Sequence, residues 1–353
     1  MTGSSGAARQ AFLDAAAARI LIKDGPFGTE LQRRDAYAGD FAGGLGLAAD
    51  QRGNGDMANL AAPAVVAAVI DDYLGAGADL IATNTFNANR VSQSEYGAER
   101  LVGEINRAAA RIARERCDAA RARDGRRRFV AGAVGPTNKT LSLSPDVGDP
   151  GYRAIDFDTL KAVYREQVDA LAEGGADFIL IETVFDTLNA KAGILATLEA
   201  QDALGRDLPL MLSMTLTDLS GRNLSGHTIE AFWASVRHAR PLTIGLNCSF
   251  GAEQLRSHVK QLSAIADTLV MAYPNAGLPN DLGEYDEEPP TTAGLVREWA
   301  DAGMVNVLGG CCGSRPDHIA AMAQAVAGLP PRAVPAQPVV TRLAGLEPFS
   351  LVA

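Results

Sequence analysis

The chain alternates short apolar runs with longer amphipathic stretches. Hydrophobicity within eight of the runs is nearly continuous, which is typical of parallel strands buried on both faces. These runs span residues 20–25, 79–86, 128–136, 177–184, 208–217, 243–249, 269–277 and 305–313. Helical periodicity fills the gaps, most clearly over residues 63–76, 158–173, 228–240, 253–266 and 316–327.

The order of these elements predicts the fold class. Strand and helix alternate eight times, which favours an α/β chain folded as a (β/α)8 TIM barrel, with an open doubly wound sheet as the alternative. We expect the barrel to occupy residues 1–330 and residues 331–353 to form an extended C-terminal tail or linker, because the segment after Leu329 begins Pro-rich. Two segments interrupt the rhythm, the Gly-rich residues 35–60 and the polar loop 136–157.

Composition narrows the class of protein. The 353 residues are 47% hydrophobic and 21% charged, which excludes a wholly disordered chain. A formal charge of −10 argues against a nucleic-acid-binding protein. No run reaches about 18 apolar residues and the start of the chain lacks a signal-peptide pattern, so no membrane association is expected. Four cysteines, two of them adjacent, do not form a disulfide framework, which favours a cytoplasmic protein.

The residues with the most chemistry follow the predicted strands. Active sites of such barrels lie at the carboxyl ends of the strands. The strand ends carry Asp24 and Gly25, Asn84, Glu182, Asn247 and Cys248, Asn275, and Cys311 and Cys312. The sequence therefore predicts one site built from residues far apart in the chain.

Three of the four cysteines lie at two of these ends. A free cysteine is most often a small buried apolar residue, and we interpret Cys117, on a charged helix, in this way. Glycines beside Cys311 and Cys312 let the chain leave the strand, so that both side chains can serve one site. Three thiolates without a fourth resemble a zinc site that keeps one position open, and ordinary burial is the alternative.

The segment after the first run, DGPFGTE (24–30), combines a carboxylate with a glycine-flanked turn. Such a turn can aim backbone N–H groups at an anion such as a carboxylate, although it is also an ordinary strand-to-loop turn. Asp24 and Glu182 can hold an ammonium group by charge-assisted hydrogen bonds, or they are simply ion-paired or cap a helix. With an open zinc centre, these groups describe a site for an amino acid that carries a thiol.

At this point the motifs resemble a known family, the zinc-dependent homocysteine S-methyltransferases, over about residues 18–350. Within that family the chain looks most like the homocysteine-binding module of cobalamin-dependent methionine synthase. The most specific segments are the 136–157 loop, FDTLNAKA (185–192) and NAGLPN (275–280). The other matching segments are residues 24–34, 77–89, 217–228, 245–256 and 309–322.

The resemblance implies a site for zinc and homocysteine. It implies that Cys248, Cys311 and Cys312 hold Zn²⁺ and are the catalytic residues, and that the homocysteine sulfur supplies the next ligand. Asn275 is implied as a metal ligand while substrate is absent. The resemblance further implies that the turn after the first run receives the substrate carboxylate and that Asp24 and Glu182 take the amino group. The full set of implied substrate contacts is Asp24, Gly25, Phe27, Gly28, Thr29, Asn84, Glu182 and Asn247.

The resemblance also implies the reaction, methyl transfer to homocysteine to give methionine. The methyl donor is expected to be methylcobalamin on a partner chain or domain, since the DxHxxG pattern of cobalamin domains is absent here. Corrinoid- and folate-binding domains or subunits are the implied partners, with the corrinoid arriving near the 136–157 loop. Two positions depart from the family pattern: Ala82 replaces a usual glutamate, and Tyr273 replaces a usual histidine.

Three alternatives remain open. One is a homocysteine S-methyltransferase that uses betaine, S-methylmethionine or another sulfonium donor. The second is a non-catalytic homocysteine-binding subunit. The third is a zinc hydrolase, which usually has histidine ligands; the four histidines, at 227, 238, 258 and 318, lie at none of the predicted strand ends.

Overall fold

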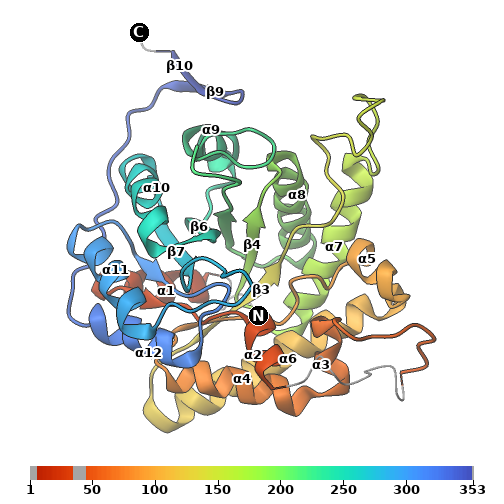
Figure 1. The fold of residues 1–353 in the computed structure, drawn as a ribbon, viewed down its shortest axis with the longest axis horizontal. Coiled ribbons are helices and arrows are strands. Elements are labelled where there is room, and N and C mark those ends of the chain that lie inside the picture. The colour runs from red at the N-terminus through yellow and green to blue at the C-terminus, as the bar shows by residue number, and fades with distance from the viewer. Residues whose placement is uncertain (1–5, 35–44, 352–353) are drawn as a thin grey trace.

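A computed structural model describes residues 6–34 and 45–351, so residues 35–44 of the Gly-rich segment lie outside the described part. Eight parallel strands form one sheet in the order β1-β8-β7-β6-β5-β4-β3-β2, with helices around it (Figure 1). The strands are β1 (Leu21–Ile22), β2 (Leu80–Ala82), β3 (Phe129–Val134), β4 (Phe178–Val184), β5 (Leu210–Met214), β6 (Thr243–Gly251), β7 (Leu269–Asn275) and β8 (Val307–Leu308). Each of the eight predicted runs contains or overlaps one of these strands.

The first and second strands close the barrel. An isolated parallel bridge joins Lys23 to Leu80. Two backbone hydrogen bonds flank it, from Asp24 N to Leu80 O at 3.0 Å and from Asp79 N to Ile22 O at 2.6 Å. The predicted (β/α)8 barrel is therefore confirmed, and the open doubly wound sheet is excluded.

Helices follow the strands and cover their outer faces. Asp156, Asp186 and Thr228 cap the helices that follow them by accepting hydrogen bonds from first-turn N–H groups. The helices are α1 (Ala7–Ala18), α2 (Phe27–Arg33), α3 (Ala58–Ala61), α4 (Pro63–Gly75), α5 (Arg90–Gln93), α6 (Val102–Asp124), α7 (Phe157–Gly174), α8 (Thr187–Leu204), α9 (Ile229–Val236), α10 (Ala252–Ile265), α11 (Pro289–Asp301) and α12 (Pro316–Ala325), with short 3₁₀ turns at η1 (Gly55–Met57), η2 (Ser94–Tyr96), η3 (Glu99–Leu101) and η4 (Arg237–Ala239).

In the described part of the chain, no single helix has both the length and the apolar character needed to cross a membrane. One pair, residues 55–61 with Pro63–Gly75, passes that test only when taken together, and it is bent by 111°.

The barrel interior is filled by side chains from most of the strands, and helix α1 lies against it. Phe12 of α1 is fully buried and packs edge-on against Phe129 and Phe178, with ring centroids 5.2 Å away in each case. These residues belong to one core cluster with Leu80, Leu180 and other strand residues. Helix α1 therefore plugs one end of the barrel, and the site predicted at the carboxyl strand ends lies at the other.

The tail leaves the barrel in an extended conformation and then forms a short hairpin. The buried side chain of Arg332 donates to the backbone oxygens of Ser263, Ala266 and Thr268, which fixes the start of the tail. The antiparallel strands β9 (Thr341–Ala344) and β10 (Pro348–Leu351) follow, and the hairpin lies beside α9 (Figure 1). Residues 330–340 contain no helix or strand, and the hairpin follows them.

Asp79 supports the closure of the barrel, and we expect its removal to weaken the fold. Its buried carboxylate accepts from Ile22 N at 3.0 Å and pairs with Arg19 and Arg126. Asp79→Ala leaves a buried N–H without its partner and two cations without their acid, so we expect a loss of about 2 to 3 kcal/mol in the free energy of unfolding. Urea denaturation measures this loss.

The control is Asp301→Ala, which removes an exposed ion pair with Arg297 and is expected to cost less than about 0.5 kcal/mol. Equal effects of the two variants would show that Asp79 has no special role in closing the barrel.

Candidate metal and substrate site

A cavity of about 280 Å³ opens at the carboxyl ends of the strands. It brings together ten of the twelve residues predicted for the site: Gly25, Phe27, Gly28, Thr29, Asn84, Glu182, Asn247, Cys248, Cys311 and Cys312. Two predicted residues, Asp24 and Asn275, are not on its wall. Segments more than 200 residues apart in the chain therefore meet at this cavity.

The three cysteines form a compact cluster on the cavity wall. Their sulfur atoms all lie within 4.8 Å of one another, and the Sγ atoms of Cys248 and Cys312 are 3.8 Å apart. Cys248 comes from the end of β6, and the other two come from the loop after β8. That loop turns at Gly313, which has φ of 78° and lies so close to Tyr285 that a Cβ atom would overlap it. Glycine at 313 thus lets both adjacent cysteines reach one site.

The backbone around this cluster is strained. Thr183, Cys248 and Ser249 all have positive φ values, between 58° and 64°, which are uncommon for residues other than glycine. Asn247 holds this arrangement: its Nδ2 donates to Thr183 Oγ1 at 2.8 Å, and its Oδ1 accepts from Thr183 N at 3.1 Å. Residues held in such uncommon conformations are often found at functional sites.

Close contact shifts the pKa values of the thiols in different directions. Hydrogen bonds from Cys248 and Cys311 lower the pKa of the Cys312 thiol to about 3. Hydrogen bonds with Cys248 and Cys312 raise the pKa of the Cys311 thiol well above its ordinary value. Three thiolates this close repel one another, so only a nearby cation allows all three to ionise.

The cluster fits a tetrahedral metal ion. Two thiolates on a zinc ion at about 2.3 Å stand roughly 3.8 Å apart, the separation found between Cys248 and Cys312. Asn275 ends β7 beside this loop, where Pro274 O accepts from Cys311 N at 2.8 Å. The Oδ1 atom of Asn275 is buried and has no hydrogen-bond partner in the described part of the chain, so a cation is a chemically suitable occupant near it.

The glycine turn after β1 lies on the same cavity. Phe27, Gly28 and Thr29 form the first turn of α2, where backbone N–H groups have no partner within the helix. Thr29 Oγ1 accepts from Gly313 N at 3.2 Å, which ties this turn to the cysteine loop. Asn84 Nδ2 donates to Gly55 O at 2.8 Å and fixes the adjoining wall. The turn therefore presents backbone N–H groups to the same cavity as the thiol cluster.

Asp24 lies behind the wall, paired with its neighbour. Its Oδ1 accepts from Lys23 Nζ at 2.8 Å, and its Oδ2 accepts from Ala82 N at 2.8 Å. Burial raises the pKa of the Asp24 carboxyl, and Lys23 opposes that rise. Asp24 therefore holds Lys23 and the end of β2 in place, and it is not among the residues that line the cavity.

Lys23 and Tyr273 form the floor of the cavity. Lys23 is 3% exposed, and its Nζ lies 4.7 Å from the centre of the Tyr273 ring. Tyr273 OH donates to Glu182 Oε2 at 2.9 Å. Burial raises the pKa of the Glu182 carboxyl, while Lys23 and Tyr273 lower it. Tyrosine in place of the expected histidine therefore orients Glu182, and Ala82 adds no acid to the wall.

Sequence reasoning did not identify Lys23 or Asp56 as residues of this cavity, and it did not foresee that Tyr273 orients Glu182. A lysine within the apolar run 20–25 was a usable signal, because a charged residue in a buried strand needs a partner. Asp56 had no such signal, since it lies in a segment without a predicted element.

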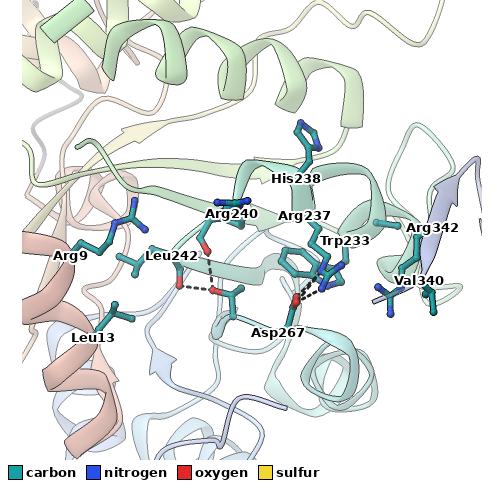
Figure 2. Close-up of a pocket in the computed structure, with 13 residues that line it drawn as sticks. Arg9, Leu13, Trp233, Arg237, His238, Arg240, Leu242, Asp267, Val340 and Arg342 are labelled. Carbon is teal, nitrogen blue, oxygen red and sulfur yellow. Dashed lines mark hydrogen bonds and ion pairs between the residues drawn. The ribbon is translucent and has the colours of Figure 1, made fainter. Parts of the chain in front are cut away.

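A larger cavity, of about 800 Å³, lies at the opposite end of the barrel. Its lining includes five basic residues: Arg9, Arg237, His238, Arg240 and Arg342. Figure 2 shows Arg237 joined to Asp267, whose pKa it lowers, and Arg9 pairs with Asp207 at 2.7 Å. The cavity borders the amino ends of β6 and β7, so it is separate from the thiol cluster at the carboxyl ends.

Comparisons with known proteins agree with this geometry. The family model described as homocysteine S-methyltransferase matches residues 21–326. The metallated crystal structure of the homocysteine methyltransferase MmuM from Escherichia coli is 23% identical in sequence, with a TM-score of 0.70, and the match covers 90% of this chain and 99% of that chain. The apo form of that protein matches over the same shares, at the same identity, with a TM-score of 0.64. The structural likeness supports the fold, and the family model identifies the chain, which belongs to the homocysteine S-methyltransferase family.

Proposed function

We propose that this protein transfers a methyl group to the thiol of L-homocysteine, giving L-methionine, with Zn²⁺ held by three cysteines. The observation that carries the proposal is the cluster of three thiols on the wall of a cavity. The same wall carries the backbone N–H groups of the turn after β1 and the buried acid Glu182. A thiol amino acid matches each of these groups. Membership of the family supports the same acceptor.

Cys248, Cys311 and Cys312 would hold the metal, and Asn275 Oδ1 would complete the set when substrate is absent. A bound zinc ion would supply positive charge that lowers the pKa of the substrate thiol and favours its thiolate form. Asn247 Nδ2 lies 3.9 Å from Cys311 Sγ, so it can steady that thiolate by a weak hydrogen bond. This arrangement leaves one position for the substrate sulfur.

The rest of the cavity orients the amino acid. The N–H groups of the turn from Gly25 to Thr29 would receive its carboxylate, and Glu182 would accept from its ammonium group. Asp24 contributes from behind the wall by holding Lys23. Together these contacts would fix the sulfur at one end of the cavity before reaction, which lowers the entropic cost of reaching the transition state.

The transfer balances as a displacement at carbon. The homocysteine thiol gives its proton to solvent, and the sulfur forms a bond to the methyl carbon. The bond from that carbon to its carrier breaks, and the carrier leaves with the electron pair. No side chain of the described cavity needs to accept the proton permanently.

We propose methylcobalamin on a partner chain or domain as the methyl donor, with corrinoid- and folate-binding domains as partners. The motifs of the 136–157 loop and of NAGLPN support this choice. Val147 and Tyr152 of that loop are exposed apolar side chains, suited to contact a partner. The need for reduced thiols favours a reducing compartment such as the cytoplasm.

The donor can be tested directly. We expect the zinc-loaded protein to form methionine from homocysteine and free methylcobalamin, and to form none from S-methylmethionine or betaine. Methionine is measured by chromatography over time. Turnover on a sulfonium or betaine donor without corrinoid would replace the proposed donor. Homocysteine binding without turnover on any donor would indicate a non-catalytic binding subunit.

A further inference from the structure

We propose that Asp56 receives the α-ammonium group of the substrate amino acid. This assignment rests on the proposed function and adds a residue to its binding site. Asp56 lies in η1, is 5% exposed, and lines the thiol-bearing cavity. It also lines a smaller neighbouring cavity of about 150 Å³.

The carboxylate of Asp56 is buried without a cation. Its Oδ1 accepts from Asn87 N at 3.4 Å and its Oδ2 from Gln93 Nε2 at 3.3 Å, both long contacts. No lysine, arginine or histidine of the described residues forms an ion pair with it. Burial raises the pKa of the Asp56 carboxyl to about 7. Protonation relieves the cost of burying this carboxyl group in the free protein, and a bound cation would stabilise its charged form.

Most of the other buried acids have a cation beside them, whereas Asp186 instead accepts from Ser142 N at 2.8 Å, Ser142 Oγ at 2.7 Å and Leu188 N at 2.9 Å. Asp79 pairs with two arginines, Asp24 with Lys23, and Glu30 with Arg33 and Arg34. Of the two acids that line the cavity, Glu182 has Lys23 near it and gives one oxygen to Tyr273. Asp56 is the lining acid whose charge the protein leaves uncompensated.

Neutral side chains hold Asp56 in place. Asn54 and Gln93 exchange two hydrogen bonds, of 2.9 and 3.1 Å, and Gln93 is the donor to the Asp56 carboxylate. Asn59 Nδ2 donates to Asp56 O at 2.7 Å and to Asn84 O at 2.6 Å. These amides fix the position of the carboxylate and supply no charge. The site is therefore rigid before a ligand arrives, which lowers the entropic cost of binding.

The position of Asp56 suits an α-amino acid. The 3₁₀ turn η1 contacts α2, whose first turn is proposed to receive the substrate carboxylate. The amino nitrogen and the carboxyl carbon of an amino acid are attached to the same carbon and lie roughly 2.5 Å apart. A carboxylate bound at the turn therefore places the ammonium group close by, on the part of the wall that η1 forms. Glu182, from β4, can complete its coordination.

Binding measurements with two thiols test this assignment. The ligands are homocysteine and 4-mercaptobutanoate, which has the same thiol and carboxylate but no amino group. Calorimetry with zinc-loaded Asp56→Asn is expected to show homocysteine affinity reduced roughly 10- to 100-fold. The affinity for 4-mercaptobutanoate is expected to stay within about 2-fold, because that ligand makes no ammonium contact. Asp301→Asn, an exposed change on α11, is the control and should alter neither affinity.

The outcomes separate the two proposals. Equal weakening of both ligands, or no change for either, would overturn the role of Asp56 while leaving the methyl-transfer proposal standing. Failure of the wild-type zinc protein to bind homocysteine would overturn both. Asp56→Glu keeps the charge but adds a methylene, so it should retain more preference for homocysteine than Asp56→Asn does. A purely structural role predicts the reverse order, since the asparagine variant preserves shape.

Discussion

Replacing Cys311 with alanine is expected to remove bound zinc and methyl transfer together. Cys311 is one of three thiols whose sulfur atoms lie within 4.8 Å of one another, and its loss leaves two protein thiolates for a metal that needs at least three ligands here. Changes in the groups that merely orient metal ligands already cost about 10- to 100-fold, so losing a ligand should cost more than about 100-fold in rate. Metal analysis after dialysis and the methionine assay measure both effects.

Cys117→Ala is the matched control. Cys117 is fully buried in α6, burial raises the pKa of its thiol to about 12, and it lies outside the cavity. This variant should keep its zinc and its rate. If Cys311→Ala kept full zinc and full rate, the three-cysteine metal site would be wrong, and the thiols would then be ordinary buried residues.

Replacing Gly245 with alanine is expected to prevent stable folding. Gly245 lies in β6, two residues before Asn247, where a Cβ atom would overlap the backbone oxygen of Met271 in β7. Backbone atoms of a paired strand cannot move aside as a flexible side chain can, so the strands would have to separate. We expect a loss of at least about 3 kcal/mol in the free energy of unfolding, at the upper end of overpacking effects. Thermal and urea unfolding measure it.

The control for this change is Gly294→Ala in the helix α11. A Cβ atom there meets nothing within 4 Å, and alanine favours helix over glycine, so this variant should gain about 0.5 to 1 kcal/mol. Opposite signs for the same substitution would show that close approach of β6 to β7, rather than glycine itself, decides the result. Equal stabilities would contradict the packing seen between these strands.

Hydrophobic pattern was sufficient to predict the barrel because parallel strands buried on both faces read as continuous apolar runs. Even the two-residue strands β1 and β8 lie within their predicted runs. The contact that closes the barrel between β1 and β2 could not be predicted from the sequence, because it depends on one bridge and on the contacts of Asp79 with Arg19 and Arg126. The hairpin of the tail was not predicted, since its strands are only four residues long and mostly exposed.

Position along a strand was enough to predict which residues meet at the strand ends, but not which partners their side chains find. Glycines and cysteines at strand ends were expected on one rim, and the cavity contains them. The predicted contact of Asp24 with substrate stays a prediction, but its pairing with Lys23 and with the Ala82 N–H was not foreseen. That outcome depends on β2 and on Tyr273 in β7, about 250 residues further along, which no local pattern could reveal.

Helix α1 has a practical consequence for defining the domain. The family model begins at residue 21, after this helix ends, so a fragment cut at that boundary would omit Phe12 and Ala16. The rings of Phe129 and Phe178 would then face water at an open end of the barrel. Such a fragment should aggregate through the exposed aromatic surface during expression. Fragments for crystallisation or for fusion to other proteins should therefore begin before Ala7.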